Sequence, residues 1–173
     1  MSEMSHTEAV TGIPTGRWVL HTPSTAIFRV RNLGVKTVQG TVPISSAEVT
    51  VADGVCSVHA ELDLSRIYTG NSKRDADLAK PKLLDTRQFP TMTFDGSGPW
   101  VLAGEQLMTG IFAARGHSIE LELKYTVERC ADYELSVRGS GGFDRLDLGI
   151  KAPSFMIGRR IDMELSVPFH RAD

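Results

Sequence analysis

The sequence contains only two cysteines, Cys56 and Cys130, and their spacing forms no CxxC pair. No apolar run approaches the roughly 20 residues that a helix needs to cross a bilayer. The first 16 residues, MSEMSHTEAVTGIPTG, lack the apolar core of a secretory signal. These absences predict a cytoplasmic protein with two reduced thiols and no transmembrane segment.

A basic surface is also missing. The 19 Lys and Arg residues are spread along the chain and are outweighed by 21 Asp and Glu residues, giving a net charge of −2. Nucleic-acid binding requires clustered cations, so we expect no nucleic-acid partner. The chain has 173 residues, 41% of them hydrophobic, which is typical of one globular domain. We expect a flexible N-terminal tail over residues 1–16 and a single domain over residues 17–170.

Motifs of common enzymes and metal sites are absent as well. There is no GxSxG nucleophile motif, and the five histidines show neither HxH nor HExxH spacing. The glycine-rich segment 139–142 lacks the lysine of a phosphate-binding loop and is interpreted as a flexible hairpin loop. We therefore predict no catalytic residue, no bound metal and no cofactor.

The dominant pattern is alternation of apolar and polar residues. It is clearest over residues 119–127, where apolar positions alternate with Glu120, Glu122, Lys124 and Thr126. The same period recurs in segments 18–20, 26–30, 56–62, 92–94, 133–137 and 161–169. A period of two over many short segments predicts antiparallel strands around one core. About eight strands fit either a sandwich or a closed barrel, and alternation does not decide between them.

Turn residues separate these segments. We predict turns at Asp53-Gly54, Asp95–Pro99, Ala103-Gly104, Arg115-Gly116 and Gly139–Gly142.

Residues 69–94 interrupt the strand pattern with an insertion. Ser72 and Asp75 have the spacing of a capping box, and Pro81 limits the helix to about two or three turns. We expect a short helical insertion over about residues 71–85, with Leu78, Leu83 and Leu84 on its apolar side. Long connections in compact domains usually carry function or cover something.

Four motifs occur along the chain in the order of one known family; the motif of the insertion is given first and the others follow in chain order. They are TGN with Arg74-Asp75, Leu78 and FPTMTF in the insertion, FRVRNLGV at 28–35, TGIF with Arg115-Gly116 at 109–116, and DRLDLGI at 144–150. Together they resemble the YceI-like, or polyisoprenoid-binding, family from about Trp18 to Val167. Asp77 stands where the family often has a histidine, and Leu148 where it has a phenylalanine.

The resemblance implies an all-β, lipocalin-like antiparallel barrel of roughly eight strands, with the helical insertion near its mouth. It also implies that an isoprenoid or similar amphiphilic lipid occupies the interior, and it makes a homodimer plausible. The tail would lie among apolar side chains, which an ordinary packed core would equally explain. These candidates for the lining of an apolar tunnel are Phe28, Val30, Leu78, Leu83, Leu84, Phe89, Phe94, Phe112 and Phe155.

Arg74, Asp75 and Arg145 are candidates for a polar mouth that meets the lipid headgroup. Each also has a structural interpretation. Asp75 could cap the helix, Arg74 could pair with a strand carboxylate, and an inward Arg145 could pair with a neighbouring aspartate.

Binding, storage or transport of a lipid is therefore the leading hypothesis. Each buried methylene contributes about 0.8 kcal/mol, so an apolar tunnel alone could hold a long chain. One alternative is an enzyme or stress-response protein that acts on a small apolar substrate in the same cavity. Another is a β protein with a filled core that works through its surface.

Overall fold

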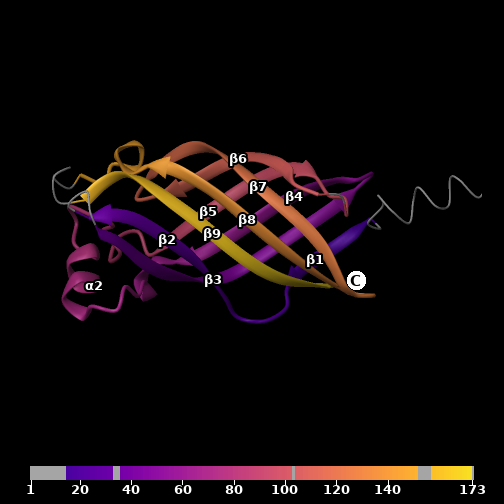
Figure 1. The fold of residues 1–173 in the computed structure, drawn as a ribbon, viewed down its shortest axis with the longest axis horizontal. Helices are drawn as coiled ribbons and strands as arrows, with labels where there is room; N and C mark the ends of the chain where they lie inside the picture. Colours follow the sequence, from indigo (N-terminus) through magenta and orange to yellow (C-terminus); the bar gives the residue numbers. More distant parts are fainter. Residues whose placement is uncertain (1–14, 33–35, 103, 152–156, 173) are drawn as a thin grey trace, which may run out of the picture.

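Nine antiparallel strands form one sheet in the described residues, which are 15–32, 36–102, 104–151 and 157–172 of this computed structural model. The sheet closes into an elongated barrel with helix α2 at one end (Figure 1). The strands are β1 (Gly16–Leu20), β2 (Ser24–Asn32), β3 (Lys36–Ala52), β4 (Val55–Asp63), β5 (Thr91–Pro99), β6 (Gln106–Ala114), β7 (His117–Ala131), β8 (Glu134–Asp144) and β9 (Ile157–Arg171). The predicted tail falls largely on residues 1–14, which lie outside the described residues.

The barrel has eight strand positions because β1 and β2 share one. Both strands pair with β3 on one side and β9 on the other, β1 near the C-terminus and β2 near α2. Pairing of β3 with β4 joins the two edges of the sheet, so no edge strand is left open. The prediction of an all-β barrel of roughly eight strands is confirmed, and its closure excludes the sandwich.

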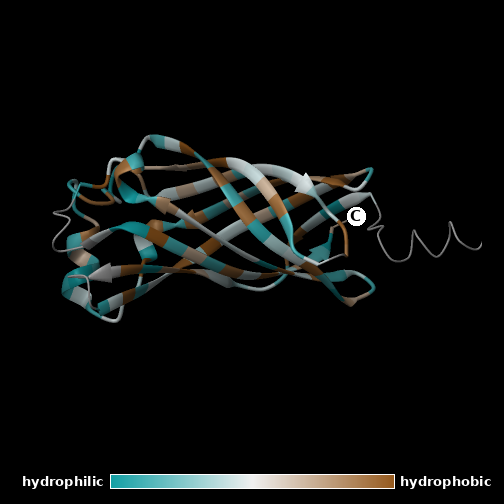
Figure 2. Ribbon diagram, turned by 45° about the horizontal axis from the view of Figure 1, so that its top comes forward, coloured by the Kyte–Doolittle hydropathy of each residue, from teal (hydrophilic) through white to brown (hydrophobic). Residues whose placement is uncertain are grey.

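Hydrophobic and hydrophilic residues alternate along the strands (Figure 2), and this alternation produces an apolar interior. In β6, for example, Met108 and Phe112 are buried whereas Leu107 and Ile111 are exposed. Two of the predicted turns are tight hairpins with positive φ at both central residues: 54° and 74° at Asp53-Gly54, and 55° and 71° at Arg115-Gly116. Such turns match the twist of the strands that they join.

The predicted turns at 95–99 and 139–142 are wrong, because both segments lie inside strands, β5 and β8. Their glycines provide space for neighbouring side chains. A Cβ atom on Gly141 would lie 2.7 Å from Cδ2 of Leu123, and one on Gly96 would lie 2.6 Å from Cζ of Phe94. Glycine in a strand often marks such close approach, which sequence alone does not distinguish from a turn.

The insertion between β4 and β5 contains the 3₁₀ helix η1 (Leu64–Arg66) and helix α2 (Ser72–Leu78). The predicted capping box is wrong by one residue: Asn71 is the N-cap, and its side chain accepts a hydrogen bond of 3.0 Å from the Arg74 amide. Asp75 instead accepts hydrogen bonds from the amide of Thr69 at 3.0 Å and from its hydroxyl at 2.5 Å. Asparagine caps a helix as well as serine does, so residue type does not distinguish Asn71 from Ser72 as the N-cap residue.

After α2 the chain continues through turns to Pro90. Helix α2 has seven residues and ends at the C-cap Ala79, two residues before Pro81. The Leu84 amide then donates to the carbonyl of Leu78 at 2.9 Å, so residues 78–84 fold back on the helix end. The insertion therefore lies where it was predicted, with a helix of two turns.

Hydrogen bonds at three places hold the insertion on the barrel. The Leu64 amide donates to the Pro90 carbonyl at 2.8 Å, which brings the two ends of the insertion together. Tyr68 exchanges two backbone hydrogen bonds, of 2.8 and 3.0 Å, with Thr41 of β3. Arg115 Nη2, from the β6–β7 turn, donates to the Pro81 carbonyl at 2.5 Å.

Large side chains fill the end of the barrel opposite α2. Trp18 and Trp100 are 2% and 1% exposed, and Trp100 meets Phe169 edge to face with ring centroids 6.3 Å apart. Cys56 lies in the same core, and burial raises the pKa of its thiol to about 11. Cys130 is exposed and unlinked to it. None of the helices in the described part of the chain is long and apolar enough to span a membrane.

We expect Trp100→Ala to lower the free energy of unfolding by about 3 to 5 kcal/mol, because it leaves a cavity in the filled end. Urea denaturation monitored by far-UV circular dichroism measures the change. Val55→Ala is the control: Val55 is 56% exposed, so its loss is expected to cost less than about 0.5 kcal/mol. Equal effects of the two substitutions would contradict this description of the core.

Candidate functional site

A cavity of about 840 Å³ occupies the α2 end of the barrel. Its walls come from the inner faces of β2, β3 and β9, from the insertion, and from the segment around η2 (Arg145–Leu148). Most of the lining side chains are apolar. The interior is thus divided between a filled half and a hollow half. The volume of the cavity lies within the usual range of roughly 300 to 1,000 Å³ for ligand sites.

Five of the predicted apolar residues line this cavity. Phe28 and Val30 project from β2, and Leu78, Leu83 and Leu84 come from the insertion. Leu84 is buried at 8% exposure. The three leucines therefore form the face of the insertion that covers the hollow half of the barrel.

The structure places three other predicted residues outside the lining. The Phe94 ring lies over Gly96 and Gly110, because neither glycine has a Cβ atom to keep it away. Phe112 packs behind Phe143, with ring centroids 5.2 Å apart, and it is Phe143 that faces the cavity. Phe89 lies beside the β6–β7 turn, where a Cβ atom on Gly116 would be 3.3 Å from its Cζ. Phe155 falls outside the described residues.

Several lining residues escaped the sequence analysis. Val30 is in register with Val38 on one side and Ile161 on the other, so the three side chains form one row across the wall. Met92 and Ile150 also line the cavity. Alternation showed that Met92 and Ile161 point inward, but only the register between strands shows which inward residues meet at the same height.

Arg74 lines the cavity, and its orientation is set by Thr69. Its Nε donates to the Thr69 hydroxyl at 2.9 Å, and its Nη2 donates to the Thr69 carbonyl at 2.9 Å. The Thr69 hydroxyl donates in turn to Asp75. Asp75 therefore orients the start of the helix and is not part of the lining.

Asp77, about one helical turn after Arg74, is the carboxylate that does line the cavity. It pairs with Lys80 at 2.8 Å, and this hydrogen bond holds the pKa of Asp77 below its ordinary value. Its charge is thus neutralised within the insertion.

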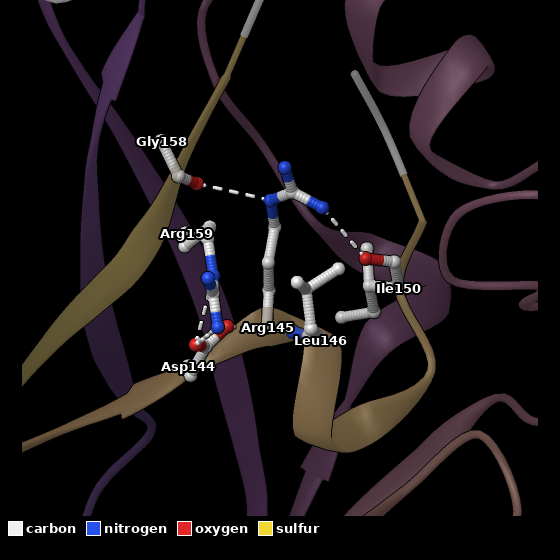
Figure 3. A network of polar contacts seen from close by, with 6 residues as sticks. All are labelled: Asp144, Arg145, Leu146, Ile150, Gly158 and Arg159. Carbon is white, nitrogen blue, oxygen red and sulfur yellow. Dashed lines mark hydrogen bonds and ion pairs between the residues drawn. The ribbon is translucent and has the colours of Figure 1, made fainter. Parts of the chain in front are cut away.

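Arg145 enters the cavity wall from η2 and is fully buried (Figure 3). Its Nε donates to the Gly158 carbonyl at 2.9 Å and its Nη1 donates to the Ile150 carbonyl at 2.7 Å. Burial lowers the pKa of Arg145, and the charge of Asp144 opposes this shift. The guanidinium therefore fastens the two chain segments that flank residues 152–156.

Asp144 makes its ion pair with Arg159 and not with Arg145, which follows it in the sequence. Its Oδ2 accepts from Arg159 Nη2 at 2.6 Å, and this contact lowers the pKa of Asp144. Its Oδ1 accepts from the Leu146 amide at 3.0 Å and so caps η2.

Arg145→Lys is expected to lower the free energy of unfolding by about 2 to 4 kcal/mol, because an ammonium cannot satisfy both buried carbonyls with the same geometry. Thermal and urea unfolding measure the loss. Arg159→Lys is the matched control. Arg159 is exposed, so its substitution should have a much smaller effect. A ranking in the opposite order would contradict a structural role for Arg145.

Nearly all the charged side chains around the cavity are positive. Among the described residues, six cationic side chains and a single carboxylate line it: Arg29, Arg74, Lys80, Lys82, Arg145 and Lys151, against Asp77. The whole chain has more acidic than basic residues. Lys82 and Lys151 are exposed, so the cavity reaches the surface between the insertion and the end of η2.

Histidine does not contribute to the cavity: none of the four histidines in the described part of the chain lines it. Nor do the described residues contain a group of His, Cys, Asp and Glu side chains that could hold a metal ion. His59 lies outside the barrel on β4, where its Nδ1 is 2.6 Å from Oδ1 of Asp95 and its Nε2 is 3.6 Å from Glu61. This arrangement raises the pKa of His59, chiefly through the Asp95 hydrogen bond.

We expect the His59 ring to titrate above its ordinary pKa of 6.5. Its small contribution to stability is therefore present below pH 6.5 and is lost as the pH rises through the higher folded-state pKa. NMR titration of the ring protons measures the midpoint. Asp95→Asn should return the midpoint toward 6.5, and an unchanged midpoint would contradict the assignment.

A second hollow, of about 720 Å³, lies on the outer surface of the barrel. It runs across β2, β9, β8 and β7, and its polar lining includes Lys124, Arg138 and Glu164. It shares no lining residue with the internal cavity.

Comparison with known proteins gives one family. The model of the YceI-like domain matches residues 18–169. Among curated proteins, none matches the sequence.

Solved structures resemble the fold at low sequence identity. BcnA of Burkholderia cenocepacia matches with a TM-score of 0.74 and 15% identity, over 84% of this chain and 95% of that one. A polyisoprenoid binding domain from Saccharophagus degradans, implicated in plant cell wall breakdown, matches with a TM-score of 0.70 and 14% identity, over 92% and 100%. The Campylobacter jejuni YCEI protein matches with a TM-score of 0.67 and 15% identity, over 83% and 90%. At sequence identities this low, the structural similarity shows a shared fold and nothing further.

Proposed function

Because this chain belongs to the YceI-like domain family, we propose that it binds an isoprenoid or similar long-chain amphiphile inside the barrel and stores or transports it. The observation that carries the proposal is the apolar cavity of about 840 Å³ at the α2 end. A hydrocarbon chain that leaves water for such a cavity gains about 0.8 kcal/mol per methylene. This binding needs no nucleophile, metal or further cofactor.

The description of a structural neighbour agrees with this proposal. The domain from Saccharophagus degradans is described as polyisoprenoid-binding, and it is similar to this chain over its whole length. Its ligand is extended to this chain on the strength of the shared fold and of the lining residues, among them Phe28, Val30 and Ile161.

The filled half of the barrel limits the length of the tail. At about 30 Å³ for each water-sized group, the cavity holds at most about 28 such groups. Trp18, Trp100 and Phe169 occupy the interior beyond it. We therefore propose a tail of no more than about 28 carbons, seated in the α2 half of the barrel.

The insertion is proposed to act as a lid over the cavity. Leu78, Leu83 and Leu84 form its underside, but only Leu84 is buried, and no residue of α2, Leu78 included, is buried. Little packing therefore opposes a movement of the helix, and segments with few buried contacts open at low free-energy cost. The hydrogen bond from Arg115 to the Pro81 carbonyl is the contact that such a movement would break.

An enzyme that acts on a small apolar substrate in the same cavity is the alternative. Arg74 and Arg145 both line the cavity, as that hypothesis requires, but they are accompanied there by no histidine of the described residues. The binding proposal uses the lining as it stands. A homodimer and a cytoplasmic location stay predictions from the sequence.

The direct test is native mass spectrometry of the purified protein, followed by organic extraction and titration with geranylgeraniol. We expect one ligand per barrel. Val30→Trp, which places an indole in the cavity, is expected to weaken geranylgeraniol binding about tenfold or more.

Ile111→Trp is the matched control, because Ile111 is a β-branched strand residue that is 49% exposed on the outer surface. It should leave binding unchanged. Melting temperatures of both variants show whether they fold. A folded wild-type protein that binds no long-chain alcohol or isoprenoid would overturn the proposal.

A further inference from the structure

The charges at the mouth of the cavity indicate the chemistry of the ligand's head. We propose that the head is anionic, a phosphate or carboxylate, and that Lys82, Lys151 and Arg74 receive it. This inference rests on the proposed lipid-binding function and specifies the ligand class further.

The first step of the argument is the distribution of charge. Of the residues that the structure describes, six basic ones and a single acidic one line the cavity, although the whole chain has 19 basic and 21 acidic residues. A chain with a net charge of −2 thus presents a local excess of positive charge at its one large apolar cavity in the described residues. Clefts with charge of one sign and apolar walls concentrate ligands of opposite charge.

The second step separates cations that are already paired from those that are available. Lys80 is paired with Asp77 at 2.8 Å, and Arg29 with Glu164 at 2.6 Å on the outer face. Arg145 is committed to the carbonyls of Gly158 and Ile150. These three therefore serve the protein's own structure.

Lys82, Lys151 and Arg74 differ from them. Among the described residues, none of the three has a carboxylate within ion-pair distance. Lys82 and Lys151 are exposed at the rim, and Arg74 is partly buried, with Thr69 fixing its guanidinium plane. Two exposed ammonium groups and one oriented guanidinium on the lining of the same cavity suit the several oxygens of a phosphate or carboxylate.

The third step concerns what surrounds these groups. Leu83 stands next to Lys82 in the chain and Ile150 next to Lys151, and both of these apolar neighbours line the cavity. Each lysine therefore lies at the boundary between apolar wall and water. This is the arrangement that an amphiphile requires, with its tail inside and its charged head at the rim. A neutral head would leave all three cations without a counter-charge.

Two ligands that share a tail and differ in the head test the proposal: geranylgeranyl phosphate and geranylgeraniol. Isothermal titration calorimetry below the micelle concentration measures both affinities. We expect the phosphate to bind about tenfold more tightly than the alcohol, and its advantage to shrink as the salt concentration rises. Palmitate against hexadecanol repeats the comparison for a carboxylate, and inorganic phosphate alone tests the head without a tail.

The variant Lys82→Gln/Lys151→Gln should remove most of the advantage of the phosphate while leaving the affinity for the alcohol unchanged. Both side chains are exposed, so the fold should be unaffected. Lys124→Gln is the matched control: it removes an exposed lysine from the outer hollow and should change neither affinity.

The outcomes separate the two proposals. If neither ligand binds, lipid binding itself is wrong. If both bind equally well and the double variant has no effect, lipid binding holds and the anionic head is overturned. If inorganic phosphate binds as tightly as geranylgeranyl phosphate, the rim is a site for free anions, and the assignment to a lipid head is overturned.

Discussion

Pairing of β3 with β4 is the constraint on which the rest of the structure depends. It joins the two edges of the sheet, so all inward side chains must share one enclosed interior. Large aromatic residues fill one half of that interior, with Trp18 and Trp100 at its centre. The other half is left hollow because β2, β3 and β9 contribute side chains that do not meet across it. Enclosure and incomplete filling together produce the cavity.

Much of this architecture could be predicted from local patterns. Alternation identified the strands, and the hairpin at Asp53-Gly54 followed from its residue types. The glycines of β5 and β8 could not be placed in this way, because a glycine that accommodates Phe94 or Leu123 has the same local sequence as a turn. A glycine of this kind is recognised only from the side chains of the strands around it, and the local sequence does not show which strands are neighbours.

The candidate site shows the same limit. Phe28, Val30 and the three leucines of the insertion were identifiable from motifs and periodicity, whereas Phe143 faces the cavity in place of Phe112 because of how two rings stack. Polar groups are harder still to predict. Asp75 and Asp77 lie two residues apart, yet one orients Thr69 and the other faces the cavity. A change of about 100° per residue around a helix decides between these roles.

The shared position of β1 and β2 has a mechanical consequence. Between them the chain leaves the sheet at Thr22 and Pro23, so β3 and β9 are bridged by two separate short strands instead of one long strand. The pairings of β2 therefore border the cavity, whereas those of β1 border the filled end. The hydrogen bonds of β2 and those of β1 are therefore made by separate strands. The wall of the hollow half is held by one set of pairings and the wall of the tryptophan-filled half by another, although both halves share β3 and β9.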